Sequence, residues 1–183
     1  MTEPLYFITG NSMKFAEAKA IIPQLIQKKI DLTEVQELDP RKILQAKMLE
    51  AKKHGLDRCI VEDTGLYFEC LKGYPGPLVK WMLEAVGSQG IVDLVHRYDN
   101  HRAVATSSIA LYISADQTIR YFDGELLGSI VAKRGLDHGW SAIFQPDGLN
   151  QTYGELTVAQ KNAISHRSKS FGALKLYLDS LQK

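Results

Sequence analysis

The stretch Cys59-Ile60-Val61-Glu62-Asp63-Thr64-Gly65 joins a short apolar run to two adjacent carboxylates and a glycine. Residues 59–61 are apolar and partly β-branched, which is typical of a buried strand. We expect this strand to end at the carboxylates. Because neighbouring strand residues point to opposite faces, Glu62 and Asp63 cannot serve the same purpose. One should face the edge of the sheet where loops build sites, and the other should brace the turn. On this stretch alone, both could be turn residues that accept backbone N–H bonds.

Working outward, the composition indicates one globular domain, residues 1–183, with two lobes. Hydrophobic residues make up 45% of the chain, enough for one well-buried core or two small ones. A net charge of +1 gives no general attraction to nucleic acid or membrane, so we expect neither as a partner. Cys59 and Cys70 have no metal-binding or redox spacing and suit a reducing compartment. Without a signal-like start or an apolar run of membrane length, we expect a cytoplasmic protein.

A second group of polar residues lies in the first predicted strand–turn–helix unit. Residues 5–8 predict a buried strand that stops at the turn Thr9-Gly10-Asn11-Ser12. Ser12 is a suitable N-cap, and Lys14 falls in the first helical turn. Polar turn residues, helix N–H groups and a lysine around one point can bind an anion. The stretch is neither a GxxxxGK[ST] nor a GxGxxG loop, and a plain capped turn with a solvated lysine is the alternative.

The rest of the chain predicts alternating helices and strands. Asp39 and Pro40 suit the N-cap and first residue of a helix that ends near Gly55. Asp123-Gly124 is expected to be a hairpin turn. The other expected elements are helices at 77–87, from 88 onward and at 165–181, strands at 29–32, 66–71, 103–113, 118–122 and 126–132, and a loop at 135–148.

Several short blocks, taken together and in order, resemble motifs of the inosine-triphosphate pyrophosphatases, or non-canonical purine NTP pyrophosphatases. Thr9-Gly10-Asn11 with Lys14 resembles the opening motif of that family, and Glu62-Asp63-Thr64-Gly65 resembles its central motif. The resemblance covers nearly the whole chain. The other similar blocks are 73–77, 145–148, 152–156 and 161–167.

The resemblance implies a fold, a reaction and a cofactor. The implied fold is α/β, with a long twisted mixed β-sheet that floors a cleft between two lobes and is flanked by helices. The implied enzyme is a homodimeric, Mg²⁺-dependent hydrolase. It would convert nucleoside triphosphates such as ITP, dITP and XTP to the monophosphate and pyrophosphate.

The resemblance also implies roles for individual residues. Asp63 would be the proton acceptor and a metal ligand, and Glu34 the second metal carboxylate, a position that Glu37 matches less well. The residues implied to hold the phosphates and sugar are Thr9, Gly10, Asn11, Lys14, Lys47, Thr64, Lys80 and Lys161. The residues implied to surround the base are His138, Gly139, Trp140, Ser141, His166 and Arg167.

The chemistry asks for the same residue types. Cleavage of a triphosphate needs lysines and a metal ion to neutralise charge, and Mg²⁺ prefers carboxylate oxygens. Because arginine only donates hydrogen bonds, Arg167 would favour a 6-oxo group over the 6-amino group of adenine. Guanine also carries a 6-oxo group, so this contact does not reject it. The alternative is that Lys161 and Arg167 belong to a solvated charged face and Trp140 to the core.

One loop departs from the family pattern. The family usually has Gly-Phe-Gly-(Tyr/Trp)-Asp-Pro at this place. This chain has Asp137 followed by His138-Gly139-Trp140-Ser141-Ala142, so His, Ser and Ala replace the usual Phe, Asp and Pro. These changes fall in the expected base pocket and predict weaker stacking and looser selectivity. Two further functions therefore stay open: the same chemistry on another modified nucleotide, as in Maf-like relatives, or a nucleotide-binding protein with weakened catalysis.

Overall fold

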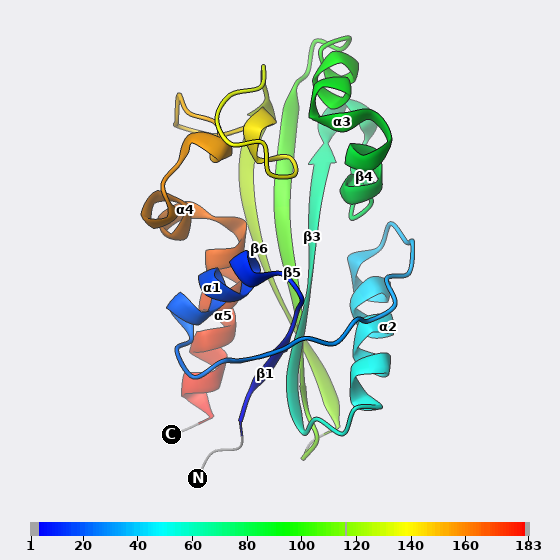
Figure 1. Ribbon diagram of the computed structural model, residues 1–183, viewed down its shortest axis with the longest axis vertical. Coiled ribbons are helices and arrows are strands. Elements are labelled where there is room, and N and C mark those ends of the chain that lie inside the picture. Colours follow the sequence, from blue (N-terminus) through cyan, green and yellow to red (C-terminus); the bar gives the residue numbers. More distant parts are fainter. Residues whose placement is uncertain (1–3, 116, 182–183) are drawn as a thin grey trace. The chain divides into compact units, whose positions relative to one another are not determined.

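The computed structural model describes residues 4–115 and 117–181, and it shows helices packed on a mixed sheet (Figure 1). The strands are β1 (Tyr6–Ile8), β2 (Ile26–Lys28), β3 (Arg58–Phe68), β4 (Pro75–Gly76), β5 (Arg102–Ile113), β6 (Thr118–Ile130) and β7 (Phe144–Pro146). The α-helices are α1 (Ser12–Ile21), α2 (Pro40–Lys52), α3 (Val79–Val95), α4 (Val158–Ile164) and α5 (His166–Ser180).

Among the described residues, seven strands form one sheet in the order β2-β1-β3-β5-β6-β7, with β4 paired to β3. Strand β1 runs parallel to β2 and β3, whereas β4 and β7 are antiparallel to their partners. This arrangement confirms the predicted α/β class and mixed sheet. No helix in the described part of the chain has the length and apolarity that a membrane span requires.

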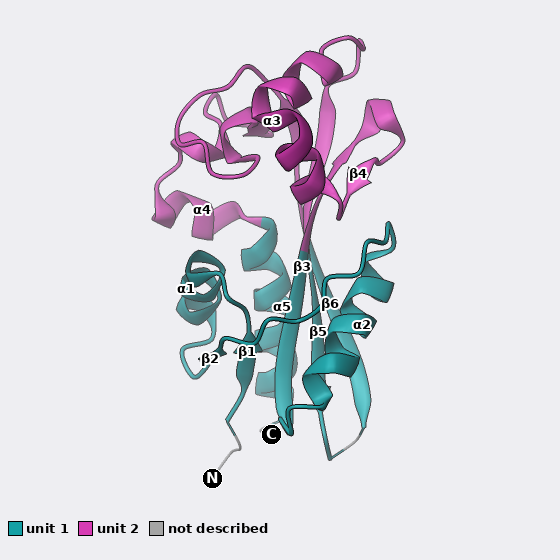
Figure 2. Cartoon of the chain, turned by 45° about the vertical axis from the view of Figure 1, so that its right-hand side comes forward, with its two compact units in different colours: residues 1–63, 107–124, 166–183 teal, residues 64–106, 125–165 magenta. Residues whose placement is uncertain are grey.

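The chain forms two compact units (Figure 2). Unit 1 consists of residues 1–63, 107–124 and 166–183, and unit 2 consists of residues 64–106 and 125–165. Strands β3, β5 and β6 contribute residues to both units. The cleft expected between two lobes stays a prediction.

The core of unit 1 has two halves, because successive strand residues face opposite sides of the sheet. Phe7 of β1 and Ile60 of β3 pack with α1 and α5, where Phe171 is fully buried. Cys59 and Val61 pack with α2 on the other side. Each fully buried large apolar side chain contributes about 1.5–3 kcal/mol. The same alternation sets the directions of the two residues that follow Val61.

Unit 2 has its own core, built largely from α3 and the parts of β3, β5 and β6 that belong to it. Helix α3 is broken at Gly87, whose φ of 69° and ψ of 173° are not helical. Such a positive φ favours glycine. This break confirms the predicted helix end at Gly87 and the new start at Ser88.

The predicted strand end at Glu62 and Asp63 is wrong, because β3 continues to Phe68. Gly65 is a strand residue of β3. Glycine suits this position because the backbone lies close to Tyr67 and β4. A Cβ atom at position 65 would lie 2.6 Å from the Tyr67 ring and 3.2 Å from the Gly76 carbonyl carbon. The glycine therefore permits close packing within unit 2 and does not form a turn.

Two other predicted elements also differ, and one helix was not predicted. Gly124 lies inside the continuous strand β6, where a Cβ would meet the backbone of α5, including Ser170 N at 2.6 Å. The glycine thus lets α5 approach the sheet and makes no hairpin. The edge strand predicted at 29–32 is instead β2 at Ile26–Lys28, and helix α4 was not predicted.

Candidate active site

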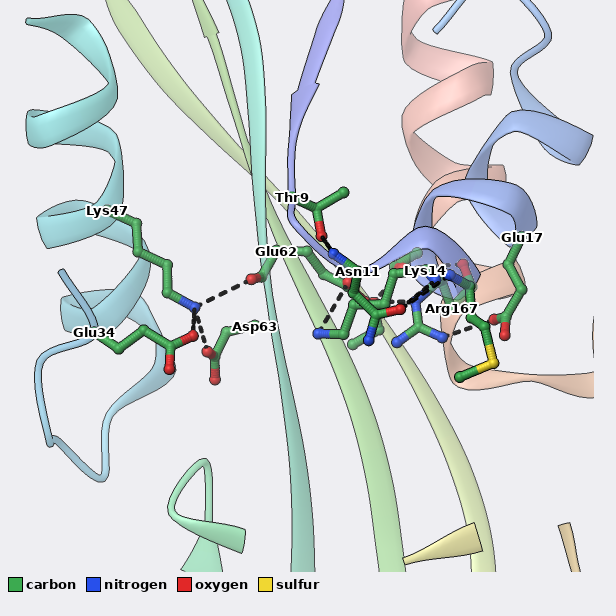
Figure 3. A network of polar contacts seen from close by, with 12 residues as sticks. Thr9, Asn11, Lys14, Glu17, Glu34, Lys47, Glu62, Asp63 and Arg167 are labelled. Carbon is green, nitrogen blue, oxygen red and sulfur yellow. Dashed lines mark hydrogen bonds and ion pairs between the residues drawn. The ribbon is translucent and has the colours of Figure 1, made fainter. Parts of the chain in front are cut away.

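The candidate residues of unit 1 gather on the two faces of β3 (Figure 3). Glu62 follows Ile60 on the face covered by α1 and α5, whereas Asp63 follows Val61 on the face covered by α2. Their carboxylates accordingly have different partners. The two neighbouring acids therefore belong to two separate charge clusters.

On the α2 face, Lys47 bridges two acidic side chains. Its Nζ lies 2.8 Å from Asp63 Oδ1 and 3.5 Å from Glu34 Oε1, and it donates a hydrogen bond of 3.3 Å to the backbone carbonyl of Glu62. Burial lowers the pKa of Lys47, but the nearby Asp63 carboxylate raises it, and the net pKa lies above its ordinary value. Lys47 is therefore an ammonium ion at neutral pH.

Glu34, and not Glu37, lies beside Lys47 and Asp63. The Glu37 carboxylate accepts hydrogen bonds from Lys42 Nζ and from the backbone N–H groups of Leu38 and Asp39. These contacts, with that of Lys42 the largest, lower the pKa of Glu37. Glu37 thus braces the start of α2, and Glu34 is the acid that approaches the central strand.

Glu34 and Asp63 offer suitable ligands for a hard divalent ion. No group of three or more histidine, cysteine, aspartate or glutamate side chains forms a metal site within residues 4–115 and 117–181. However, Asp63 Oδ2 is buried and has no hydrogen-bond partner among the described residues. Mg²⁺ commonly uses one or two carboxylates and completes its shell with water and substrate phosphates. The pair therefore fits such a site.

On the other face, Glu62 connects two helices and a neighbouring strand. Its carboxylate, 1% exposed, accepts hydrogen bonds from Ser107 Oγ at 2.7 Å and Arg167 Nε at 2.8 Å, and Lys14 Nζ lies 3.3 Å away. Arg167 Nη1 also donates to Glu17 at 2.7 Å. We call Lys14, Glu17, Glu62, Ser107 and Arg167 the Glu62 network.

The charges within the Glu62 network support one another. Burial raises the pKa of Glu62, but the positive charges of Arg167 and Lys14 outweigh it and lower the pKa to about 2. For Arg167 the effect of burial has the opposite direction and lowers the pKa. The negative charges of Glu62 and Glu17 outweigh it, so the net pKa of Arg167 is raised. Both groups therefore stay ionised although both are buried.

Sequence reasoning did not assign Glu17 or Ser107 to the site. Glu17 lies one helical turn after Lys14 in α1, a spacing that places the two residues on one helix face. That spacing was the available signal for Glu17. Ser107 gave none, because its contact depends on how β5 pairs within the sheet.

His166 lies next to the Glu62 network at the start of α5 and is almost fully buried. Burial, with the positive charge of Arg167 adding to it, lowers the pKa of His166 to about 3. The imidazole is therefore neutral at physiological pH. A neutral ring in this place can accept or donate a hydrogen bond but carries no charge for a phosphate.

The turn before α1 is capped by Asn11 and not by Ser12 as predicted. Asn11 Oδ1 accepts hydrogen bonds from Met13 N at 3.0 Å and Lys14 N at 3.1 Å. Asn11 N in turn donates to Thr9 Oγ1 at 3.1 Å. Gly10 and Asn11 are exposed. The predicted turn is thus confirmed as an ordered, accessible helix start.

The remaining candidates belong to unit 2. Trp140 packs against Phe144 and Tyr153, with ring centroids 5.4 and 5.7 Å apart. Ser141 Oγ lies 2.8 Å from the carbonyl oxygen of His138 and so stabilises its own loop. The other unit 2 candidates are Thr64, which follows Asp63 in β3, Lys80 in α3, Gly139 in the same loop as Ser141, and Lys161 in α4.

Within unit 2, Trp140 and Lys161 both contact Tyr153, and the Lys161 ammonium lies 5.1 Å from the centre of that ring. His138 is exposed, and Lys80 lies 5.3 Å from the ring centre of Trp81. Unit 1, for its part, brings together the residues Lys14, Glu34, Lys47, Asp63, His166 and Arg167 around β3.

This fold is that of solved Ham1 proteins. The Ham1 protein of Staphylococcus aureus matches with a TM-score of 0.83 and 23% identity over 97% of this chain and 99% of its own. The Coxiella burnetii HAM1 protein matches with a TM-score of 0.82 and 24% identity over 96% and 98%. A structure described as a nucleoside-triphosphatase or dITP/XTP pyrophosphatase from Mycobacterium abscessus matches with a TM-score of 0.73 and 24% identity over 93% and 97%.

The model of the Ham1 family matches residues 5–177, nearly the whole chain. The protein therefore belongs to the Ham1 family. This membership confirms the resemblance to the inosine-triphosphate pyrophosphatases.

Proposed function

We propose that this protein is a Mg²⁺-dependent nucleoside-triphosphate pyrophosphatase that acts on non-canonical purine nucleotides such as ITP, dITP and XTP. The observation that carries the proposal is the pair of charge clusters on β3, with Asp63, Glu34 and Lys47 on one face and the Glu62 network on the other. Family membership and the dITP/XTP activity named for the Mycobacterium abscessus structure support the same chemistry.

In the proposed reaction, Asp63 orients a water molecule and accepts its proton. The water oxygen forms a bond to one phosphorus of the α–β bridge. The bond between that phosphorus and the bridging oxygen breaks, which releases the monophosphate and pyrophosphate. Lys14 and Lys47 neutralise the charge on the phosphate oxygens. Mg²⁺ held by Glu34 and Asp63 would supply further charge neutralisation when bound.

For base selection, we propose that Arg167 donates to the 6-oxo group of the purine. Glu62 and Glu17 fix the orientation of its guanidinium group, with donor–acceptor distances of 2.8 and 2.7 Å. A fixed donor favours a 6-oxo acceptor and leaves a 6-amino group without a partner. This role explains selection against adenine and does not explain selection against guanine.

A second candidate function is the same reaction on a different modified nucleotide. The loop at 138–142 favours it, because His138 is exposed and polar and the Ser141 hydroxyl is engaged within the loop. A base pocket that includes this loop would offer weaker stacking than one with phenylalanine at position 138.

The test is a panel of nucleoside triphosphates with Mg²⁺, followed by pyrophosphate release. We expect ITP, dITP and XTP to give the highest kcat/KM. Highest activity on another nucleotide would favour the second candidate. Tight nucleotide binding without pyrophosphate release would contradict both candidates and favour a binding protein.

A further inference from the structure

The position of Lys47 raises a question about its role, because its ammonium occupies the place between the two proposed metal carboxylates. We propose that Lys47 is an exchangeable counter-ion: it pairs with Asp63 and Glu34 in the metal-free protein and moves to the triphosphate when a divalent ion binds. This inference rests on the proposed function, since it assigns an order of events to that site.

The Lys47 ammonium contacts the two acidic side chains and has little contact with solvent. Its side chain is 9% exposed, and Nζ contacts Asp63 Oδ1 at 2.8 Å, the Glu62 carbonyl at 3.3 Å and Glu34 Oε1 at 3.5 Å. Two carboxylates that converge without a cation would repel each other. Lys47 therefore compensates the acids before any metal is present.

The same contacts make the arrangement exchangeable. The longer distance is to Glu34, whose side chain is 49% exposed and can turn toward an entering ion. Lysine carries a compact charge on a flexible four-carbon stem, so its ammonium can move while its backbone stays within α2. A divalent ion held by Glu34 and Asp63 would repel that ammonium at short range.

The exchange changes the sign of the net charge at the site. Lys47 with two carboxylates carries a net charge of −1, which opposes the approach of a triphosphate. A divalent ion raises the net charge of the same group to +1, which attracts one. Metal binding should therefore precede or accompany nucleotide binding, and Lys47 should then contact phosphate oxygens.

The test uses Lys47→Met, which keeps the length and apolar character of the stem but removes the charge. Mn²⁺ binding is measured by electron paramagnetic resonance without nucleotide. We expect the Kd for Mn²⁺ to fall about tenfold or more, because the competing cation is gone. With Mn²⁺ present, the Kd for a non-hydrolysable α,β-imido inosine triphosphate should rise about tenfold, because a phosphate contact is lost.

The matched control is Lys42→Met, since Lys42 also lies in α2 and pairs with an acid, Glu37, at 3.1 Å. It should change neither constant. Mn²⁺ binding by Lys47→Met that is weaker than, or equal to, that of the unmodified protein would overturn the proposal, including the case in which neither protein binds. Both affinities are measured without pyrophosphate release. The proposal about Lys47 can therefore be tested even if the protein does not hydrolyse ITP.

A measurement on the unmodified chain covers the case in which Lys47→Met does not fold. With ¹³C-labelled lysine, the Cε signal of Lys47, assigned by its loss in Lys47→Arg, should shift when Mg²⁺ is added without nucleotide. The Lys42 signal should stay in place. A Lys47 signal that does not move at Mg²⁺ concentrations that saturate the protein would contradict the exchange.

Discussion

Asp63 faces α2 and pairs with Lys47. The preceding residue, Glu62, is instead enclosed by a serine, a lysine and an arginine. The difference follows from the alternation of side chains along a strand. Sequence reasoning predicted that Glu62 and Asp63 have different tasks. It could not predict the partners of Glu62, which come from α1, β5 and α5.

Replacing Asp63 with Asn tests its proposed role as proton acceptor. The amide keeps the shape of the side chain but cannot accept the proton or hold a metal ion as strongly. We expect turnover of ITP to fall by about two to four orders of magnitude. Pyrophosphate release measures this effect, and near-normal turnover by a folded Asp63→Asn protein would rule out the assignment.

Replacing Glu62 with Gln should reduce stability, since it leaves Arg167 and Lys14 without the buried charge that they share. Loss of one partner from a buried ion pair costs about 3–5 kcal/mol. Urea denaturation measures the free energy of unfolding. The comparison variant is Glu17→Gln, which removes only one of the two acids bound to Arg167 and should cost less.

His166 should make stability depend on pH. Its pKa is about 3 in the folded protein, against 6.5 ordinarily, so the unfolded chain binds the additional proton below pH 6.5. Stability due to the neutral ring is therefore fully present above pH 6.5 and falls as the pH drops toward 3, by up to about 1.4 kcal/mol per pH unit.

Urea denaturation at pH 7.5, 6.5 and 5.5 would measure this slope in the unmodified protein and in His166→Gln. The glutamine variant should lose most of the dependence between pH 6.5 and 5.5. An equal slope in the two proteins would show that His166 is not its source.

At the scale of elements, sequence patterns were correct at two positions where a local rule sets the structure, although Asn11 and not the predicted Ser12 caps α1. Asp39 caps α2 through its bond to Arg41 N, and Gly87 breaks α3, both as expected. Gly65 and Gly124 were misread because their need for glycine comes from close packing with distant residues, which no local pattern contains. For the candidate site, the motifs predicted which residue types take part but could not predict which of them are in contact.

The loop at 138–142 carries the prediction about selectivity. We expect the triple change His138→Phe, Ser141→Asp and Ala142→Pro to lower the KM for ITP and to increase the preference for ITP over ATP. The phenyl ring would restore stacking worth about 1–3 kcal/mol. Steady-state kinetics with both nucleotides provide the measurement, and no gain in either quantity would favour the second candidate function.

The single change Ser141→Asp serves as the control for that experiment. The serine hydroxyl can donate to the carbonyl oxygens of Leu136 and His138, at 3.0 and 2.8 Å, whereas an ionised carboxylate cannot. This single variant should therefore lose stability, which separates damage to the loop from an effect on the base.

At the scale of the whole molecule, the resemblance to the pyrophosphatases adds an expectation about assembly. We predict a homodimer. Sedimentation equilibrium should give twice the mass of one chain over a range of protein concentrations. A mass that stays at that of a single chain would contradict the prediction.

The chain order of the two units has a consequence for synthesis on the ribosome. Unit 2 lies wholly within residues 64–165, but unit 1 needs the segment 166–183. Phe7 packs against Phe171 with ring centroids 5.3 Å apart, but it leaves the ribosome long before Phe171 emerges. Until that moment the apolar face of β1 has no α5 to cover it, so the nascent N-terminal segment should be a client for chaperones. Premature termination at residue 165 would leave a chain in which unit 2 is complete and the proposed catalytic unit cannot close its core.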